Sequence, residues 1–331
     1  MKWTAILVAV LAPLLALSAP RVAHAHEVRP AYLDLVEERP GEFSVLWKTP
    51  MQGEMRLALA PVFSGPVDLL APVATKVTGD AAVQTWRIRA DGLRGMSLRI
   101  VGLEGTLTDV LARITFADSS TWVVRLTPRE PEAVVPARPS GWSVASTYLA
   151  LGVEHILTGV DHLLFVLALL LLTSGPWRLA KTVTAFTLAH SITLALATLG
   201  IVRVPPKPVE AVIALSIVFV ASEILRNRRE KAGWSERMPW LVAFTFGLLH
   251  GFGFAGALSD VGLPDGQIPV ALLFFNVGVE AGQLLFIGGV LVMAAGLQRL
   301  RIVWPRWSVL ATPYAIGSLA MFWMIQRLAA F

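Results

Sequence analysis

The sequence predicts a mixed fold: an N-terminal antiparallel β-sandwich-like domain followed by an all-α bundle of six transmembrane helices. Hydrophobic residues make up 55% of the chain and charged residues only 15%, with a mean hydropathy of +0.64, which is typical of a polytopic membrane protein. In the first part of the chain apolar residues alternate over short runs, which indicates half-buried strands. Long apolar segments follow, each sufficient to cross a hydrocarbon core of about 30 Å.

Residues 1–25 are predicted to be a secretory signal peptide. Lys2 precedes an apolar run, and the small residues Ala23 and Ala25 form a cleavage site. Cleavage there would make His26 the new N-terminus, whose amine and ring are a candidate chelate for copper or nickel. Because the chain has no cysteine, thiolate sites and disulfides are excluded, and any metal must be held by nitrogen and oxygen.

Residues 26–127 are predicted to form an extracytoplasmic β-rich domain. Alternation is clearest over 43–47, 85–89 and 97–101. Two further short runs flank residues 117–120, whose composition predicts a hairpin turn. Several short strands of this kind favour a small antiparallel sandwich. The acids and bases are scattered without a catalytic motif, which favours a packing or partner-binding module.

Residues 128–142 are predicted to be a Pro-rich linker. Four prolines and several charged residues between 128 and 139 disfavour both helix and strand. The predicted membrane domain, 143–331, follows this linker. Its six apolar segments lie near 148–173, 180–201, 209–226, 239–259, 268–297 and 308–328.

Basic residues predict the orientation of these segments. With the N-terminal domain outside, ten Lys and Arg residues belong to the three predicted cytoplasmic loops, whereas the outer loops and tail hold three, Arg203, Lys207 and Arg327. This difference satisfies the positive-inside rule for a bacterial cytoplasmic (inner) membrane. The net charge of +5 is therefore explained by membrane topology, and no nucleic-acid partner is expected.

Ionisable residues within the apolar segments form the candidate site. His155 and His162 are seven residues apart, which on a continuous helix puts both rings on one face, beside Asp161. Three further segments each contribute one ionisable residue near the middle of the segment. An ionisable group there costs on the order of 2.5 to 3.5 kcal/mol by insertion scales, so it is a functional candidate by default. The predicted metal ligands are His155, Asp161, His162, His190, His250 and Glu280.

Three more residues are predicted to support these ligands or to line the site. Asn276, Glu280 and Gln283 lie at i, i+4 and i+7 and form one polar stripe on an otherwise apolar helix. Gly251 allows close helix approach and leaves backbone free for a ligand. Neutral imidazoles with carboxylates suit nickel, cobalt, zinc or iron, and the absence of sulfur argues against Cu(I). Asp161 suits two roles, as a ligand or as the partner that orients a ligating histidine.

The run 155–162, His-Ile-Leu-Thr-Gly-Val-Asp-His, resembles the His-x5-Asp-His signature of the HupE/UreJ family of small membrane proteins. Segments 186–194, 249–255 and 275–280 resemble the later polar helices of that family, in the same order. The resemblance is closest to a longer branch with an N-terminal extracytoplasmic domain, which short members lack. The chain also has Ala257 where the second motif of the family has a glutamate.

The resemblance implies nickel uptake for hydrogenase and urease, by secondary transport or facilitated diffusion. The expected function is a permease in the lipid bilayer whose substrate is a divalent transition metal ion, with nickel or cobalt favoured and zinc possible. Two alternatives stay open. Three histidines could hold zinc in an intramembrane metallohydrolase, or the outer domain could bind a protein partner in a non-transporting assembly or sensor protein.

Overall fold

The structure is a computed structural model. It describes residues 30–52, 55–78, 81–137, 141–229, 233–260, 268–299, 308–329 and 331. The described residues form two compact units, a β-rich unit within 24–148 and 257–271 and a helical unit within 149–256 and 272–331. The predicted signal peptide and His26 lie outside the described residues. The predicted domain boundaries at 25, 127 and 142 stay a prediction.

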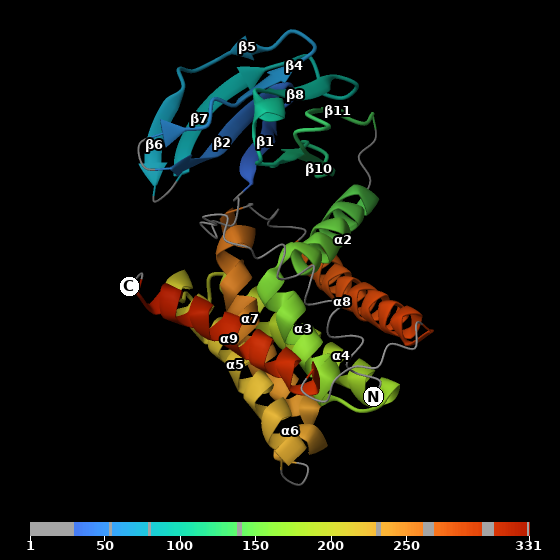
Figure 1. Cartoon of the computed structure of the whole chain (residues 1–331). Coiled ribbons are helices and arrows are strands. Elements are labelled where there is room, and N and C mark those ends of the chain that lie inside the picture. Colours follow the sequence, from blue (N-terminus) through green and yellow to red (C-terminus); the bar gives the residue numbers. More distant parts are fainter. Residues whose placement is uncertain are drawn as a thin grey trace. The chain divides into compact units, whose positions relative to one another are not determined.

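The β-rich unit contains two sheets (Figure 1). Its strands are β1 Ala31–Arg39, β2 Glu42–Gln52, β3 Met55–Arg56, β4 Ala60–Phe63, β5 Asp68–Leu69, β6 Ala74–Thr78, β7 Ala81–Arg89, β8 Ser97–Val101, β9 Val110–Thr115, β10 Thr121–Leu126 and β11 Glu132–Val134. The larger sheet has the order β10-β9-β1-β2-β7-β5, with β3 beside β2 and β6 beside β7, and the smaller sheet has the order β11-β8-β4. The alternating runs 43–47, 85–89 and 97–101 lie in β2, β7 and β8, as predicted.

The prediction of a purely antiparallel domain is wrong. β1 pairs antiparallel with β2 but parallel with β9, where Leu33 lies opposite Ala112. Parallel neighbours require a long crossover connection, and here all strands from β2 to β8 intervene between β1 and β9. The prediction that 128–139 forms neither helix nor strand is also wrong, since β11 pairs with β8. Both corrections have the same cause, because the pairing partners are distant in the sequence.

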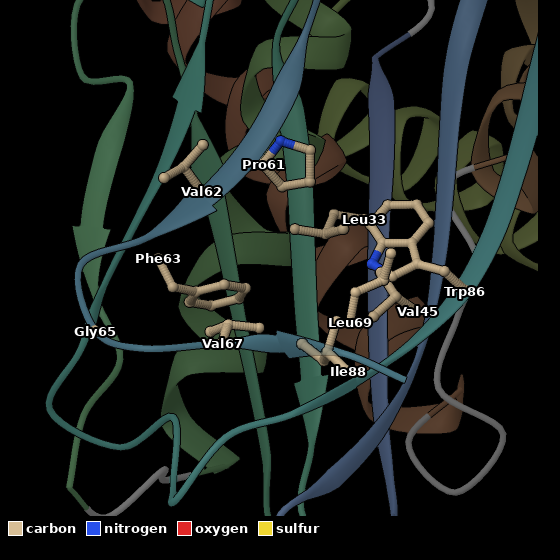
Figure 2. A pocket seen from close by; sticks show the side chains of 10 residues that line it. All are labelled: Leu33, Val45, Pro61, Val62, Phe63, Gly65, Val67, Leu69, Trp86 and Ile88. Atoms are coloured by element: carbon tan, nitrogen blue, oxygen red, sulfur yellow. The ribbon is translucent and has the colours of Figure 1, made fainter. Parts of the chain in front are cut away.

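Side chains from both sheets pack into one apolar core. Leu33, Trp47 and Leu98 belong to this cluster and are at most 1% exposed. Beside it lies an apolar cavity of about 330 Å³, whose lining includes Phe63 and Trp86 (Figure 2). Its lining residues carry neither a charged side chain nor an imidazole. The cavity therefore lacks the ligands that a transition metal cation requires.

Helices cover all six predicted apolar segments (Figure 1). They are α2 Gly141–Thr158, α3 Val160–Leu172, α4 Pro176–Thr198, α5 Pro206–Arg229, α6 Trp234–Arg237, α7 Pro239–Asp260, α8 Ile268–Arg299 and α9 Ser308–Ala329. Pro176 stands at the start of α4, where its missing N–H leaves no helical hydrogen bond unmade. In the helical unit α5 packs along both α9 and α3.

Three helices are long and apolar enough to cross a membrane, namely α4, α5 over Lys207–Asn227, and α8. Together α2 and α3 pass the same test, but they are bent by 74° and count as one further span at most. Three or four of the six predicted spans therefore meet this test among the described residues. Among the described side chains, α7 is apolar over Pro239–Gly253.

We expect Leu98→Ala to lower the opening free energy of the β-rich unit by about 2 to 5 kcal/mol, because it removes buried methyl groups and leaves a cavity. Val101→Ala on the same strand is the matched control, since Val101 is 49% exposed. Hydrogen exchange of the β8 and β4 amides in the full-length protein measures both effects. Equal protection in the two variants would contradict the assignment of Leu98 to the core.

Candidate metal site

Gly159 separates two of the predicted ligands by breaking the first membrane segment. Its ψ of 92° is extended, so α2 ends at Thr158 and α3 begins at Val160. A Cβ at this position would lie 2.8 Å from the His155 carbonyl oxygen and 2.9 Å from His162 Nδ1. The prediction that both histidines share one face of a continuous helix is therefore wrong. Their rings nonetheless meet, with centroids 4.7 Å apart, because the chain bends between them.

Four histidine rings from four helices gather in the helical unit. They are His155 on α2, His162 on α3, His190 on α4 and His250 on α7. The ring of His162 is central, with its centroid 5.1 Å from that of His250 and 6.3 Å from that of His190. His162 is 8% exposed, and His190 and His250 are fully buried. Residues far apart in the sequence thus form one imidazole cluster.

Three of these rings offer nitrogens to a single ion. One ring nitrogen each from His155, His162 and His190 lies within 4.8 Å of the other two. A ligating imidazole nitrogen lies about 2.0 to 2.1 Å from a zinc ion, so a small inward movement would bring all three into bonding distance. The group has the number and type of ligands found in many metal sites.

Hydrogen bonds assign the tautomer of two rings. His250 Nδ1 lies 2.9 Å from the carbonyl oxygen of Phe246, which can only accept, so Nδ1 carries the proton. His190 Nδ1 lies 3.3 Å from Asn276 Oδ1, and Asn276 Nδ2 donates to the Leu272 carbonyl oxygen at 2.7 Å, which orients the amide. Each ring therefore presents an unprotonated Nε2, the form that binds a metal ion.

Three buried nitrogens of the cluster lack a hydrogen bond. Within the part of the chain that the structure describes, the Nε2 atoms of His162, His190 and His250 have no hydrogen-bond partner. Leaving such an atom unsatisfied costs about 1 to 3 kcal/mol. The surroundings are aromatic, since the ring centroids of Phe165 and Phe186 lie 4.9 Å and 5.2 Å from that of His250. A cation is a partner that would satisfy these lone pairs.

Glycines allow the helices to approach closely enough for the rings to meet. A Cβ at Gly251 of α7 would overlap Thr193 Oγ1 of α4, and one at Gly247 would lie 2.5 Å from a backbone oxygen of α4. Gly152 of α2 and Gly278 of α8 likewise face the backbone of each other's helix. Small residues at crossings let membrane helices pack at short distance. The positions of His155, His190 and His250 depend on these crossings.

The polar stripe of α8 faces α4. Asn276 is 7% exposed and Gln283 is 1% exposed, so hydrogen bonds within the bundle replace those with water. The stripe thereby holds α4 in register with α8 and orients the ring of His190. The three contacts are Asn276 Oδ1 with His190 Nδ1 at 3.3 Å, Glu280 Oε1 with Thr184 Oγ1 at 2.6 Å, and Gln283 Oε1 with Thr187 Oγ1 at 3.0 Å.

The two predicted carboxylates have partners other than the histidines. Asp161, in the first turn of α3, accepts a hydrogen bond of 2.6 Å from Arg327 Nη2 of α9. Glu280 accepts from Thr184, and neither carboxylate belongs to the group of three ligands found among the described residues. Sequence reasoning missed Arg327, which it assigned to the outer tail. An arginine inside the last apolar segment was the signal that could have found it.

The comparisons with known proteins agree with the sequence motifs. A family model described as HupE / UreJ protein matches residues 130–327. This range holds the four histidines, the α8 stripe, Asp161 and Arg327. No curated protein and no solved structure matches the chain.

We expect Gly159→Ala to destabilise the helical unit by about 1 to 3 kcal/mol, because the new methyl group would collide with the His155 carbonyl and the His162 ring. Gly289→Ala is the matched control, since a Cβ at that helical position meets no atom within 4 Å. Thermal unfolding of both purified variants in detergent measures the difference. A Gly159→Ala protein as stable as the Gly289→Ala protein would contradict the proposed role of the bend.

Proposed function

Because the chain belongs to the HupE/UreJ family, we propose that it is a membrane transporter for a divalent transition metal cation, nickel or cobalt. The observation that carries this proposal is the group of ring nitrogens from His155, His162 and His190, which lie within 4.8 Å of one another. The association of the family with nickel favours this metal among those that imidazole nitrogen binds well. The metal ion is the substrate, and the lipid bilayer surrounds the helical unit.

The cluster supports transport by transfer of the cation between overlapping sets of ligands. His162 belongs to the group of three, and its ring centroid is also 5.1 Å from that of His250. A cation held by the group can therefore gain His250 as a ligand before it loses His155. Conduction requires such exchange, because each binding step must be weak enough for release.

Orientation follows from the basic residues. We propose that the β-rich unit is extracytoplasmic and that the segment between α5 and α7, which includes Arg237 of α6, faces the cytoplasm, in accordance with the positive-inside rule. The N-terminal end of α5, which holds Glu210, and the C-terminal end of α9, which holds Arg327, would then face outward. Cations would reach the histidine cluster from that side.

An intramembrane zinc hydrolase is the second candidate, because three histidine ligands are typical of catalytic zinc sites. Hydrolysis also needs a base to activate water. The two predicted carboxylate ligands are engaged, Asp161 by Arg327 and Glu280 by Thr184. Stoichiometric zinc that survives purification, together with hydrolysis of a lipid or peptide, would favour the enzyme over the transporter.

We expect His162→Ala and His190→Ala each to reduce cellular uptake of radioactive nickel and cobalt to background at equal expression, because each removes a ring nitrogen from the group of three. Ser222→Ala is the matched control, since this polar side chain of α5 is exposed and donates to the Phe219 carbonyl oxygen of its own helix. Wild-type uptake in both histidine variants would overturn the proposed function.

We expect Asn276→Leu to weaken nickel binding about 10-fold to 100-fold, the usual effect of removing a group that orients a ligating histidine. The replacement keeps the size of the side chain but removes the acceptor for His190 Nδ1. Gln283→Leu is the comparison, because Gln283 pairs with Thr187 and not with a histidine. Calorimetric titration of the purified variants measures both affinities, and equal losses would argue against a specific role for Asn276.

A further inference from the structure

Arg327 joins three helices at one point beside the histidine cluster. Its Nη2 lies 2.6 Å from Asp161 Oδ2 at the start of α3. Its Nη1 donates to the Glu210 carbonyl oxygen of α5 at 3.0 Å, and its Nε lies 3.6 Å from Glu210 Oε2. The side chains of Arg327 and Asp161 are only 19% and 22% exposed, whereas that of Glu210 is 48% exposed. The guanidinium thus contacts two carboxylates, one sheltered and one close to solvent.

The ion pair lies within electrostatic reach of the proposed metal ligands. Asp161 directly precedes His162 in the chain. In a protein interior, where the effective dielectric constant is far below that of water, one unit charge a few ångströms away alters the affinity for an ion by about tenfold or more. The pair therefore bears on the affinity of the cluster.

A cation among neutral imidazoles needs a negative charge nearby. A divalent ion brings two positive charges into apolar surroundings, and uncompensated charge there is costly. Asp161 directly precedes the ligand His162, as Glu154 directly precedes His155. Arg327 balances the charge of Asp161. The Asp161 carboxylate cannot fully neutralise both the Arg327 guanidinium and a bound divalent ion.

We propose that Arg327 is a positioning residue that competes with the transported cation for the Asp161 carboxylate and thereby sets the affinity of the histidine cluster. This inference rests on the proposed function. When a divalent cation binds, Asp161 turns toward it and Arg327 is left with Glu210, to which it is already hydrogen bonded. Charge is conserved in the exchange, and the contact between α9 and α3 loosens. When the cation leaves, Arg327 pairs with Asp161 again and the contact is restored.

Calorimetric titration of full-length purified protein in detergent with nickel tests this exchange. Arg327→Gln removes the competing charge, so we expect nickel to bind about tenfold more tightly. Asp161→Asn removes the carboxylate that would offset the charge of the cation and leaves Arg327 with Glu210 alone, so we expect binding about tenfold weaker. The double variant restores the charge balance, and its affinity should return toward that of the wild type. Because it removes both charges of the sheltered pair and leaves only the Glu210 carboxylate, which is 48% exposed, it also shows whether a single variant fails through misfolding.

Two controls separate competition from a structural role. Arg226→Gln breaks a 3.0 Å ion pair between two residues of α5, Arg226 and Glu223, and should leave nickel affinity unchanged. Arg327→Lys keeps the charge and should stay near the wild-type affinity. In cells, Arg327→Gln should lower both the KM and the maximal rate of nickel uptake, because a tighter site releases its cation more slowly.

The outcomes distinguish this inference from the proposed function. If Arg327→Gln weakens nickel binding, or if the double variant binds no better than Asp161→Asn, Arg327 only holds the fold together and the inference is overturned. If that occurs while His190→Ala still abolishes binding, the proposed function stands alone. A wild-type protein that binds none of nickel, cobalt and zinc would overturn both.

Discussion

Lone pairs buried among apolar side chains are the constraint on which the helical unit depends. Three Nε2 atoms, on His162, His190 and His250, have no hydrogen-bond partner among the described residues, although packing normally pairs nearly every buried polar atom. By contrast, two of the Nδ1 atoms have a hydrogen-bond partner. Asn276 orients the ring of His190 and the Phe246 carbonyl orients that of His250. One side of each of these rings is therefore held and the other is left for a ligand, which is how metal-binding histidines are commonly arranged.

Close helix crossings, one bend and interhelical hydrogen bonds bring these rings together. Membrane helices gain little from apolar burial against one another, because lipid is equally apolar, so close crossings at small residues and interhelical hydrogen bonds decide the packing. Gly251 and Gly152 supply such crossings, and Gly159 supplies the bend. The polar stripe of α8 adds hydrogen bonds that orient more than they stabilise, since each contributes about 0.6 to 2 kcal/mol. The opposite charges of Asp161 and Arg327 balance each other in an ion pair.

The histidines of the candidate site are confined to one of the two units. Between Glu27 and Glu154 the sequence has no histidine, and the cavity beside the core of the β-rich unit is lined by apolar residues. Its core is made from two sheets, one of them mixed through the parallel pairing of β1 with β9. Among the described residues, the group of imidazoles that could hold a metal ion lies in the helical unit. Most of this unit falls within the region that the family model matches.

The sequence by itself determined the class of protein, the alternating strands, the apolar helices and the identity of the histidines, because composition and periodicity are local properties that each segment carries alone. It also led to the family, through motifs such as 155–162. Only the tertiary structure decided which strands pair, that the first apolar segment bends at Gly159, and that Arg327 reaches Asp161 across 166 positions in the chain. Strand pairing and the ion pair depend on contacts between residues far apart in the chain, and the bend at Gly159 depends on a backbone conformation. A residue pattern within one segment reveals none of these.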